Sequence, residues 1–309
     1  MDLATAVLTY YFTHADRLSA EKRFHLANRM VAWNGDARAK SLLEACKPVF
    51  VPEPVTDETL DASFDHAAAV AEQAKPNIVA YDLRKPFFDR YPALMGLEAE
   101  LFRLRHLREL YDIDAGDVFL RRHPLPALRE LEQALLADAA AMRALSTWAI
   151  NYTYLLHRTV LQEEGSIDVD ALYALGGGYD TNDEEQLRLL IYLYTHCIIA
   201  ESNFYARELP ADTLPAYRRM LARLEELFGE RLDKTSLDTK LEFLVCCRLA
   251  GYETNLAGPI HDECAQSLSP EGTFIIDTHN VFRSNQLKKS FEASEHRNVL
   301  FIMSVLPRL

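Results

Sequence analysis

An apolar run with a few polar interruptions holds the first side chains that could carry chemistry. Residues 185–205 read EQLRLLIYLYTHCIIAESNFY, and the interruptions are His196, Cys197, Glu201 and Ser202. Burying such groups without a partner costs about 1–3 kcal/mol for a neutral group and more for a charge. Each is therefore expected to have a partner or to face a wet cavity. In such a cavity His196 and Glu201 could act as acid and base.

His196 and Glu201 are five residues apart, which separates them by about 140° around a helix. His196 shares its face with Tyr192 and Asn203, so these two residues are candidates for substrate binding beside it. A core histidine and a buried ion pair are the simpler alternative for the two charged positions.

The segment IIDTHNVF (275–282) places Asp277 and His279 two residues apart. A carboxylate beside an imidazole can tune a general base or provide metal ligands. We expect His279 to act as the base, oriented by Asp277, with His196 as the acid or hydrogen-bond donor. The alternative is an Asx-type turn that caps a helix.

The segment HDEC (261–264) is the one candidate for a metal. On one helix, His261 and Cys264 share a face, and His279 is the further residue that could complete a zinc site. The alternative is a solvated, acidic helix start. No other metal or cofactor is expected.

Two further positions are candidates for a pocket wall. In INYTYLLH (150–157), Tyr154 and His157 are three residues apart and share a helix face. Cys246 and Cys247 are adjacent and point about 100° apart, so one is expected in the core and Cys247 is the candidate for the pocket. Ordinary core packing is the alternative for all of these residues.

Apolar residues recur with helical periodicity along almost the whole chain, and no convincing period-two strand is present. Proline residues lead us to expect irregular structure in 47–55 and 75–92. The pattern predicts an all-α fold with helices over 3–14, 19–33, 37–46, 56–74, 94–111, 127–138, 142–162, 185–205, 214–228, 236–250, 259–268 and 294–306.

Composition narrows the function classes. The 309-residue chain has a formal net charge of −13, which argues against nucleic acid and anionic membrane surfaces as partners. No apolar run reaches the ~18–20 residues that span a bilayer, and the N-terminus does not read as a signal peptide. Five cysteines without a CxxC pair are typical of reduced thiols, so a cytoplasmic location is expected.

The last third of the chain carries a resemblance to a known superfamily. Its features are Gly251-Tyr252 at a helix end, Gln266, the turn Glu271-Gly272-Thr273-Phe274, and His296 in the next helix. This pattern resembles the terminal hairpins of alpha/alpha toroid proteins, which include terpene cyclases, prenyltransferase beta subunits and six-hairpin enzymes. The acidic motifs of the cyclases are missing, and Asp262-Glu263-Cys264 only approximates the prenyltransferase zinc motif. The similarity is closest to uncharacterised bacterial members.

The resemblance implies antiparallel helical hairpins in an (α/α) toroid or a related helical-repeat ring. Residues 187–204 would then lie in the inner ring, beside an axial pocket. A single domain over 1–309 is expected, with two possible halves, 1–175 and 176–309, joined at the turn Gly176–Gly178.

The expected function is that of a bacterial biosynthetic or tailoring enzyme. Its axial pocket would perform acid–base chemistry of the lyase, isomerase or hydrolase type on a small or peptide-like metabolite. One alternative is a non-catalytic helical scaffold or peptide-binding protein. A second alternative is a zinc-dependent transferase.

Overall fold

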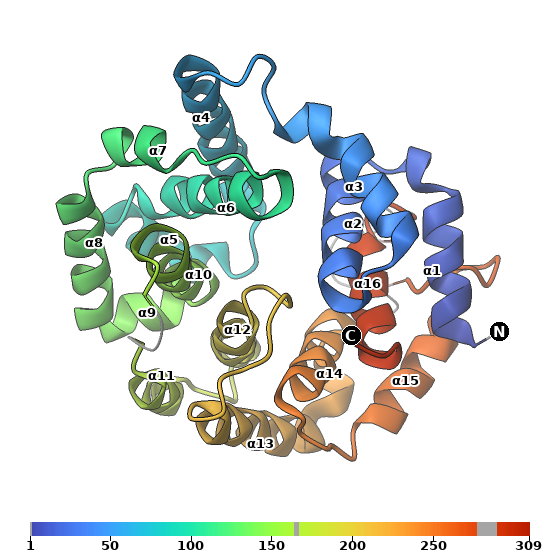
Figure 1. Cartoon of the computed structure of the whole chain (residues 1–309). Coiled ribbons are helices and arrows are strands. Elements are labelled where there is room, and N and C mark those ends of the chain that lie inside the picture. Colours follow the sequence, from blue (N-terminus) through green and yellow to red (C-terminus); the bar gives the residue numbers. More distant parts are fainter. Residues whose placement is uncertain (1, 164–166, 277–288) are drawn as a thin grey trace. The chain divides into compact units, whose positions relative to one another are not determined.

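The computed structural model describes residues 2–163, 167–276 and 289–309, and in these ranges the fold is all-α, as the sequence predicts (Figure 1). Within the same ranges no strand forms; a single antiparallel bridge pairs Leu268 with Ile275. The helices are α1 (Leu3–Thr13), α2 (Ala20–Asn34), α3 (Ala37–Phe50), α4 (Asp57–Ala74), α5 (Tyr81–Arg90), α6 (Leu94–Tyr111), α7 (Gly116–Arg122), α8 (Leu125–Ala137), α9 (Ala139–Leu145), α10 (Thr147–Leu155), α11 (Val169–Leu175), α12 (Glu184–Glu201), α13 (Leu214–Arg231), α14 (Leu237–Ala250), α15 (Ala257–Gln266) and α16 (Glu295–Val305).

The chain forms two compact units. The split unit combines residues 1–46 with residues 202–309, and the continuous unit is residues 47–201. The turn Gly176–Gly178 lies inside the continuous unit. The toroid and the single domain with two halves stay predictions.

The core of the continuous unit surrounds α10. This helix packs against α6 and α12, and α4 packs on α6. Every residue from Ala149 to Leu155 is buried, so this part of α10 has no solvent face. In α12, all residues from Leu187 to Glu201 are buried except the half-buried Arg188, Tyr192 and His196. These three lie four residues apart on one face, which confirms that the apolar run is buried on most sides.

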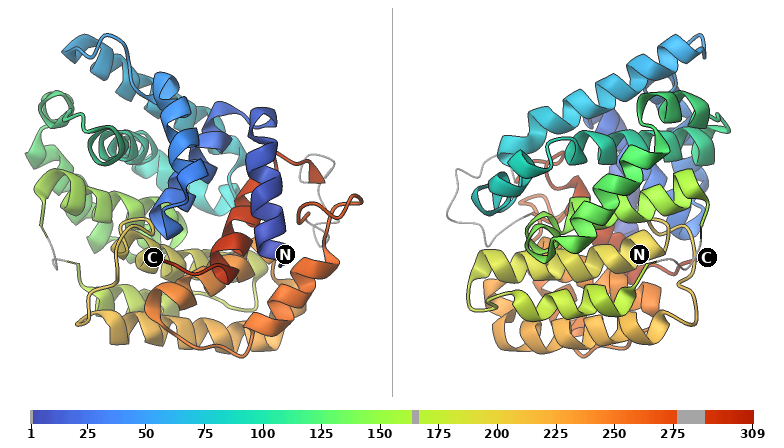
Figure 2. Two further views of the ribbon diagram at one scale, coloured as in Figure 1. Left: turned by 45° about the vertical axis from the view of Figure 1, so that its right-hand side comes forward. Right: turned by 90° about the vertical axis from the view of Figure 1, so that its left-hand side faces the viewer.

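The core of the split unit surrounds α16, which packs against α1, α2 and α14. Figure 2 shows α16, drawn in red, beside the blue N-terminal helices that are remote from it in sequence. The fully buried carboxylate of Glu295 fixes the start of α16 against α2. It lies 2.6 Å from His25 Nδ1 and 3.3 Å from Lys22 Nζ.

Local signals in the sequence set several helix ends. Ser19 and Ser236 cap α2 and α14 by accepting hydrogen bonds from backbone N–H groups, and Asp183 accepts one from Gln186 at the start of α12. Gly35 and Gly251 end α2 and α14 with φ of 63° and 54°, a conformation that glycine adopts without steric cost. Among the described residues, none of the helices combines the length and the apolar character that crossing a bilayer requires.

Two expectations based on proline are wrong in part. The segment 75–92 contains α5 with Pro86 inside it, and α3 continues through Pro48 to Phe50. Both prolines are exposed, so water can reach the carbonyl groups that lose their helical hydrogen-bond donors. The buried side chains of Arg84 and Phe88 hold α5 in place.

Two long helices expected from the sequence are interrupted. The segment 142–162 breaks at Ser146, where φ is 28°, and it ends in a π-helical turn, Leu156–Leu161. Arg84 satisfies the backbone at this break by donating to the carbonyl of Ala144 and the hydroxyl of Ser146, both at 3.1 Å. The helix expected over 185–205 ends at Glu201 and is followed by three left-handed residues, Asn203–Tyr205, with φ between 50° and 77°. Two short helices, α7 and α11, were not expected.

Candidate functional site

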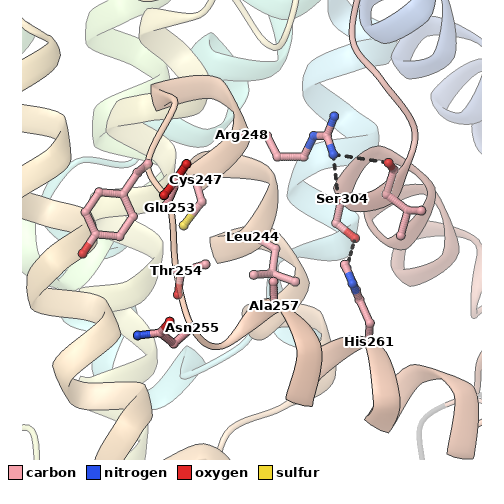
Figure 3. Close-up of a pocket in the computed structure, with 11 residues that line it drawn as sticks. Leu244, Cys247, Arg248, Glu253, Thr254, Asn255, Ala257, His261 and Ser304 are labelled. Carbon is pink, nitrogen blue, oxygen red and sulfur yellow. Dashed lines mark hydrogen bonds between the residues drawn. The ribbon is translucent and has the colours of Figure 1, made fainter.

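A cavity of about 760 Å³ lies within the split unit, between the end of α14, the start of α15 and the end of α16 (Figure 3). Its wall contains charged and polar groups from all three helices, among them Arg248, His261 and Ser304. Cys247 also lines it. A volume of this size is within the range of about 300–1,000 Å³ that is usual for small-molecule sites.

The loop that closes one side of the cavity is fixed from α13. Gly251 ends α14, and the backbone N–H of Tyr252 returns to the carbonyl of Cys247 at 2.8 Å. Glu225 then accepts hydrogen bonds from the Tyr252 hydroxyl, the Thr254 hydroxyl and the Asn255 N–H, at 2.7, 2.6 and 3.1 Å. Partial burial raises the pKa of Glu225, but these bonds outweigh it and the pKa is lowered overall. The carboxylate therefore stays ionised and holds the loop.

Arg248 is the main positive group in the cavity wall. Its Nη1 donates to the carbonyl oxygens of Ser304 and Val305 at the end of α16, both at 3.2 Å. Its Nε and Nη2 donate to no atom of the described residues. Partial burial lowers its pKa, although a guanidinium remains charged at neutral pH. The guanidinium also lies over the ring of Trp33, with its Cζ 5.9 Å from the ring centroid.

His261 is held as a neutral imidazole beside this cation. Burial, and next the charge of Arg248, lowers its pKa. Its Nε2 lies 3.0 Å from the hydroxyl of Ser304, which in turn donates to the carbonyl of Phe301 at 2.8 Å. The tautomer with its proton on Nε2 would donate to this hydroxyl and keep a lone pair on Nδ1. Figure 3 shows Ser304 between Arg248 and His261, with dashed hydrogen bonds to both.

The residues predicted to bind zinc lie in different surroundings. His261 lines the cavity, whereas Cys264 is fully buried, and burial raises the pKa of its thiol to about 12. Burial likewise raises the pKa of Cys247, which stays a protonated thiol. In the part of the chain that the structure describes, no group of three or more His, Cys, Asp or Glu could hold a metal ion. Asp277 and His279 lie outside the described residues, so their roles and the zinc site stay predictions.

His196 belongs to a hydrogen-bonded chain inside the continuous unit. Its Nδ1 lies 3.1 Å from Asn151 Oδ1, and Asn151 Nδ2 donates to Glu98 Oε1 at 2.8 Å. The edge of the imidazole meets the ring of Tyr192, with centroids 6.3 Å apart. Burial raises the pKa of Glu98 to about 7, against the opposing hydrogen bond from Asn151.

Glu201 has a different partner. Its carboxylate forms an ion pair with Arg158 of the π-helical turn, and both side chains are largely buried. Glu201 and His196 thus contact Arg158 and Asn151, respectively. The pairing matches the buried ion pair that was the simpler alternative.

The remaining candidates for substrate binding are dispersed. Tyr154 is buried in the core of the continuous unit. His157 lines a separate cavity of that unit. Asn203 belongs to the split unit, where it is the first of the left-handed residues.

Sequence reasoning missed Arg248 and Ser304. Their importance comes from the meeting of α14 and α16, which no local pattern encodes. A basic residue three positions before a helix-ending glycine is the available signal, since such residues often bind terminal carbonyl groups. No protein-family model matches the chain, and comparison with curated proteins and with solved structures found no match either.

Proposed function

We propose that this protein is an enzyme that performs acid–base chemistry on a small metabolite with an anionic group, in the cavity beside Arg248 and His261. The observation that supports this is the pairing, within one cavity, of a cation with uncommitted donors and a histidine kept neutral. In this proposal the general base is His261, whereas the sequence predicted His279.

Each of the two residues has a defined role. Arg248 binds a carboxylate or phosphate through Nε and Nη2, the planar fork that matches such groups. His261 accepts a proton through Nδ1, because its lowered pKa leaves the imidazole unprotonated at neutral pH. A lyase or isomerase takes this proton from carbon, and a hydrolase takes it from water.

The proposal is tested with a set of small carboxylates and phosphate esters, whose consumption is followed by mass spectrometry. For any compound consumed, His261→Gln should lower kcat by about 10²–10⁴-fold, the usual contribution of a positioned general base. Arg248→Gln should raise KM by about tenfold or more, because a charge-assisted hydrogen bond is lost.

Arg218→Gln is the matched control. Arg218 is also an exposed arginine that donates to carbonyl groups at a helix end, those of Ala250 and Gly251, but it does not line the cavity. It should leave kcat and KM nearly unchanged. Wild-type rates in His261→Gln would contradict the assignment of the base. Failure to turn over any compound, together with a bound peptide or protein, would favour the scaffold alternative.

A further inference from the structure

A second cavity lies within the continuous unit, among α8, α9, α10, the π-helical turn and α11. Its volume is about 340 Å³, which suits a small ligand. Much of its wall is apolar and includes Leu136, Met142, Leu172 and Leu175. Glu132 and His157 are the charged pair in this wall.

One oxygen of Glu132 is committed and the other is not. Oε1 lies 2.6 Å from His157 Nε2, whereas Oε2 meets no donor among the described residues. The glutamate is only 6% exposed, and it lines the cavity. A carboxylate with so little access to water gains from a ligand that supplies a further donor.

His157 cannot supply the missing donor. Its Nε2 faces Glu132, and its Nδ1 lies 3.3 Å from the carboxylate of Glu163. The hydrogen bond with Glu132 raises the pKa of His157, which favours the form with a proton on each nitrogen. Both protons are directed to carboxylates that are already in contact.

The charges favour a cationic ligand. Asp168, which caps α11, is a second carboxylate in the cavity wall. Even with His157 protonated, the two carboxylates leave an excess of negative charge. A bound carboxylate would meet like charge, and an alcohol would provide one neutral donor, whereas an ammonium group provides three charged ones.

We propose that this cavity binds a small primary ammonium ion with an apolar body, whose nitrogen donates to Glu132 and whose body packs on the leucines of α8 and α11. The site is independent of the acid–base site in the split unit, so either can fail without the other.

Isothermal titration calorimetry of the full chain with hexylammonium, hexan-1-ol and sodium hexanoate tests this proposal. Hexylammonium should bind about tenfold or more tightly than hexan-1-ol, the ratio expected for one charge-assisted hydrogen bond, and hexanoate should bind most weakly. Equal affinity for the amine and the alcohol, or no binding of the amine, would overturn the proposal.

Three variants locate the site. Glu132→Gln should weaken hexylammonium by about tenfold, because the charge is lost and a donating NH₂ group replaces one acceptor oxygen. It should leave hexan-1-ol nearly unchanged, since a hydroxyl can accept from that group. Glu163→Gln is the matched control, because Glu163 also contacts His157 but does not line the cavity; it should preserve the preference for the amine. Ala171→Phe, from the exposed side of α11, should fill the cavity and abolish binding of both ligands. Unchanged binding in Ala171→Phe would place the ligand elsewhere and refute the site.

Discussion

Glu98 is a buried carboxyl group that ties the stability of the continuous unit to pH. It is 8% exposed, and its only hydrogen bond within the described residues comes from Asn151. Burial raises its pKa from 4.5 to about 7. The folded protein therefore holds a proton on Glu98 at pH values where the unfolded chain has released it.

The sign of the resulting pH dependence follows from linkage. The contribution of Glu98 to the free energy of unfolding is fully present below pH 4.5 and is lost as the pH rises through 7. For a shift of this size the loss is about 3 kcal/mol. We predict that Glu98→Gln removes this loss, so that the variant gains stability relative to wild type as the pH rises.

Urea denaturation of both proteins across this pH range measures the effect. Groups common to both chains cancel in the difference between their free energies of unfolding. A difference that does not change with pH would show that Glu98 does not titrate in this way.

The same residues mark the limit of sequence reasoning at this scale. The sequence predicts that a polar group on so apolar a helix needs a partner, and His196 has one in Asn151. The sequence cannot identify Asn151 or Glu98 as members of this chain of hydrogen bonds, because they lie on α10 and α6. The chain forms only after these helices pack against α12. Arg248 and Ser304 were missed for the same reason.

At the scale of elements, Gly176 permits the close approach of α11 and α12. A Cβ added there would lie 1.8 Å from the hydroxyl oxygen of Tyr194, which donates to the carbonyl of Tyr173 at 2.7 Å. Glycine is required at this position because a side chain would not fit. Its φ of −59° could be adopted by any residue type.

We predict that Gly176→Ala destabilises the protein by about 2–3 kcal/mol through overpacking. Gly177→Ala is the matched control in the same turn, because its added Cβ would meet nothing within 4 Å. It should be neutral or stabilise slightly. Thermal unfolding of both variants measures the difference.

A double variant identifies the cause. Tyr194→Leu removes the ring atoms that the new methyl group would strike. It should therefore lower the free energy of unfolding by less in the Gly176→Ala background than in wild type. Additive costs would indicate that the methyl group is accommodated in another way.

Helix existence was predictable from the sequence, and helix interruptions were not. Periodicity and caps were sufficient to place α2, α4 and α14, and periodicity alone was sufficient for α6. No glycine or proline at Ser146 predicts the break from the sequence. It depends on the distant guanidinium of Arg84, which supplies hydrogen bonds that a continuous helix would not need.

At the scale of the whole molecule, the split unit depends on contacts remote in sequence. Tyr11 of α1 donates to the carbonyl of Phe291 at 2.9 Å, and Trp33 of α2 donates to that of Leu306 at 3.1 Å. No pattern within residues 1–46 indicates that their partners follow the entire continuous unit. The all-α class was predictable, whereas this division of the chain was not.

The division predicts an order of folding. Contacts distant in sequence require closure of a long loop and form slowly. In pulse-labelled hydrogen exchange during refolding from urea, we expect amides of α6 and α10 to gain protection before those of α1 and α2.

The packed pair α13 and α14 is an internal control. It belongs to the split unit but is local in sequence, so it should gain protection early. Protection of α1 together with α13 would contradict the proposed order.

The long-range pairing of α1 and α2 with α16 also matters during translation. The two N-terminal helices leave the ribosome long before the segment that covers Tyr11, Leu26 and Trp33, all of which are fully buried in the folded protein. Until then their apolar faces are exposed to other nascent chains. Holdase chaperones are therefore expected to bind the chain early in its synthesis. The yield of folded protein should fall when elongation is slowed within residues 47–201.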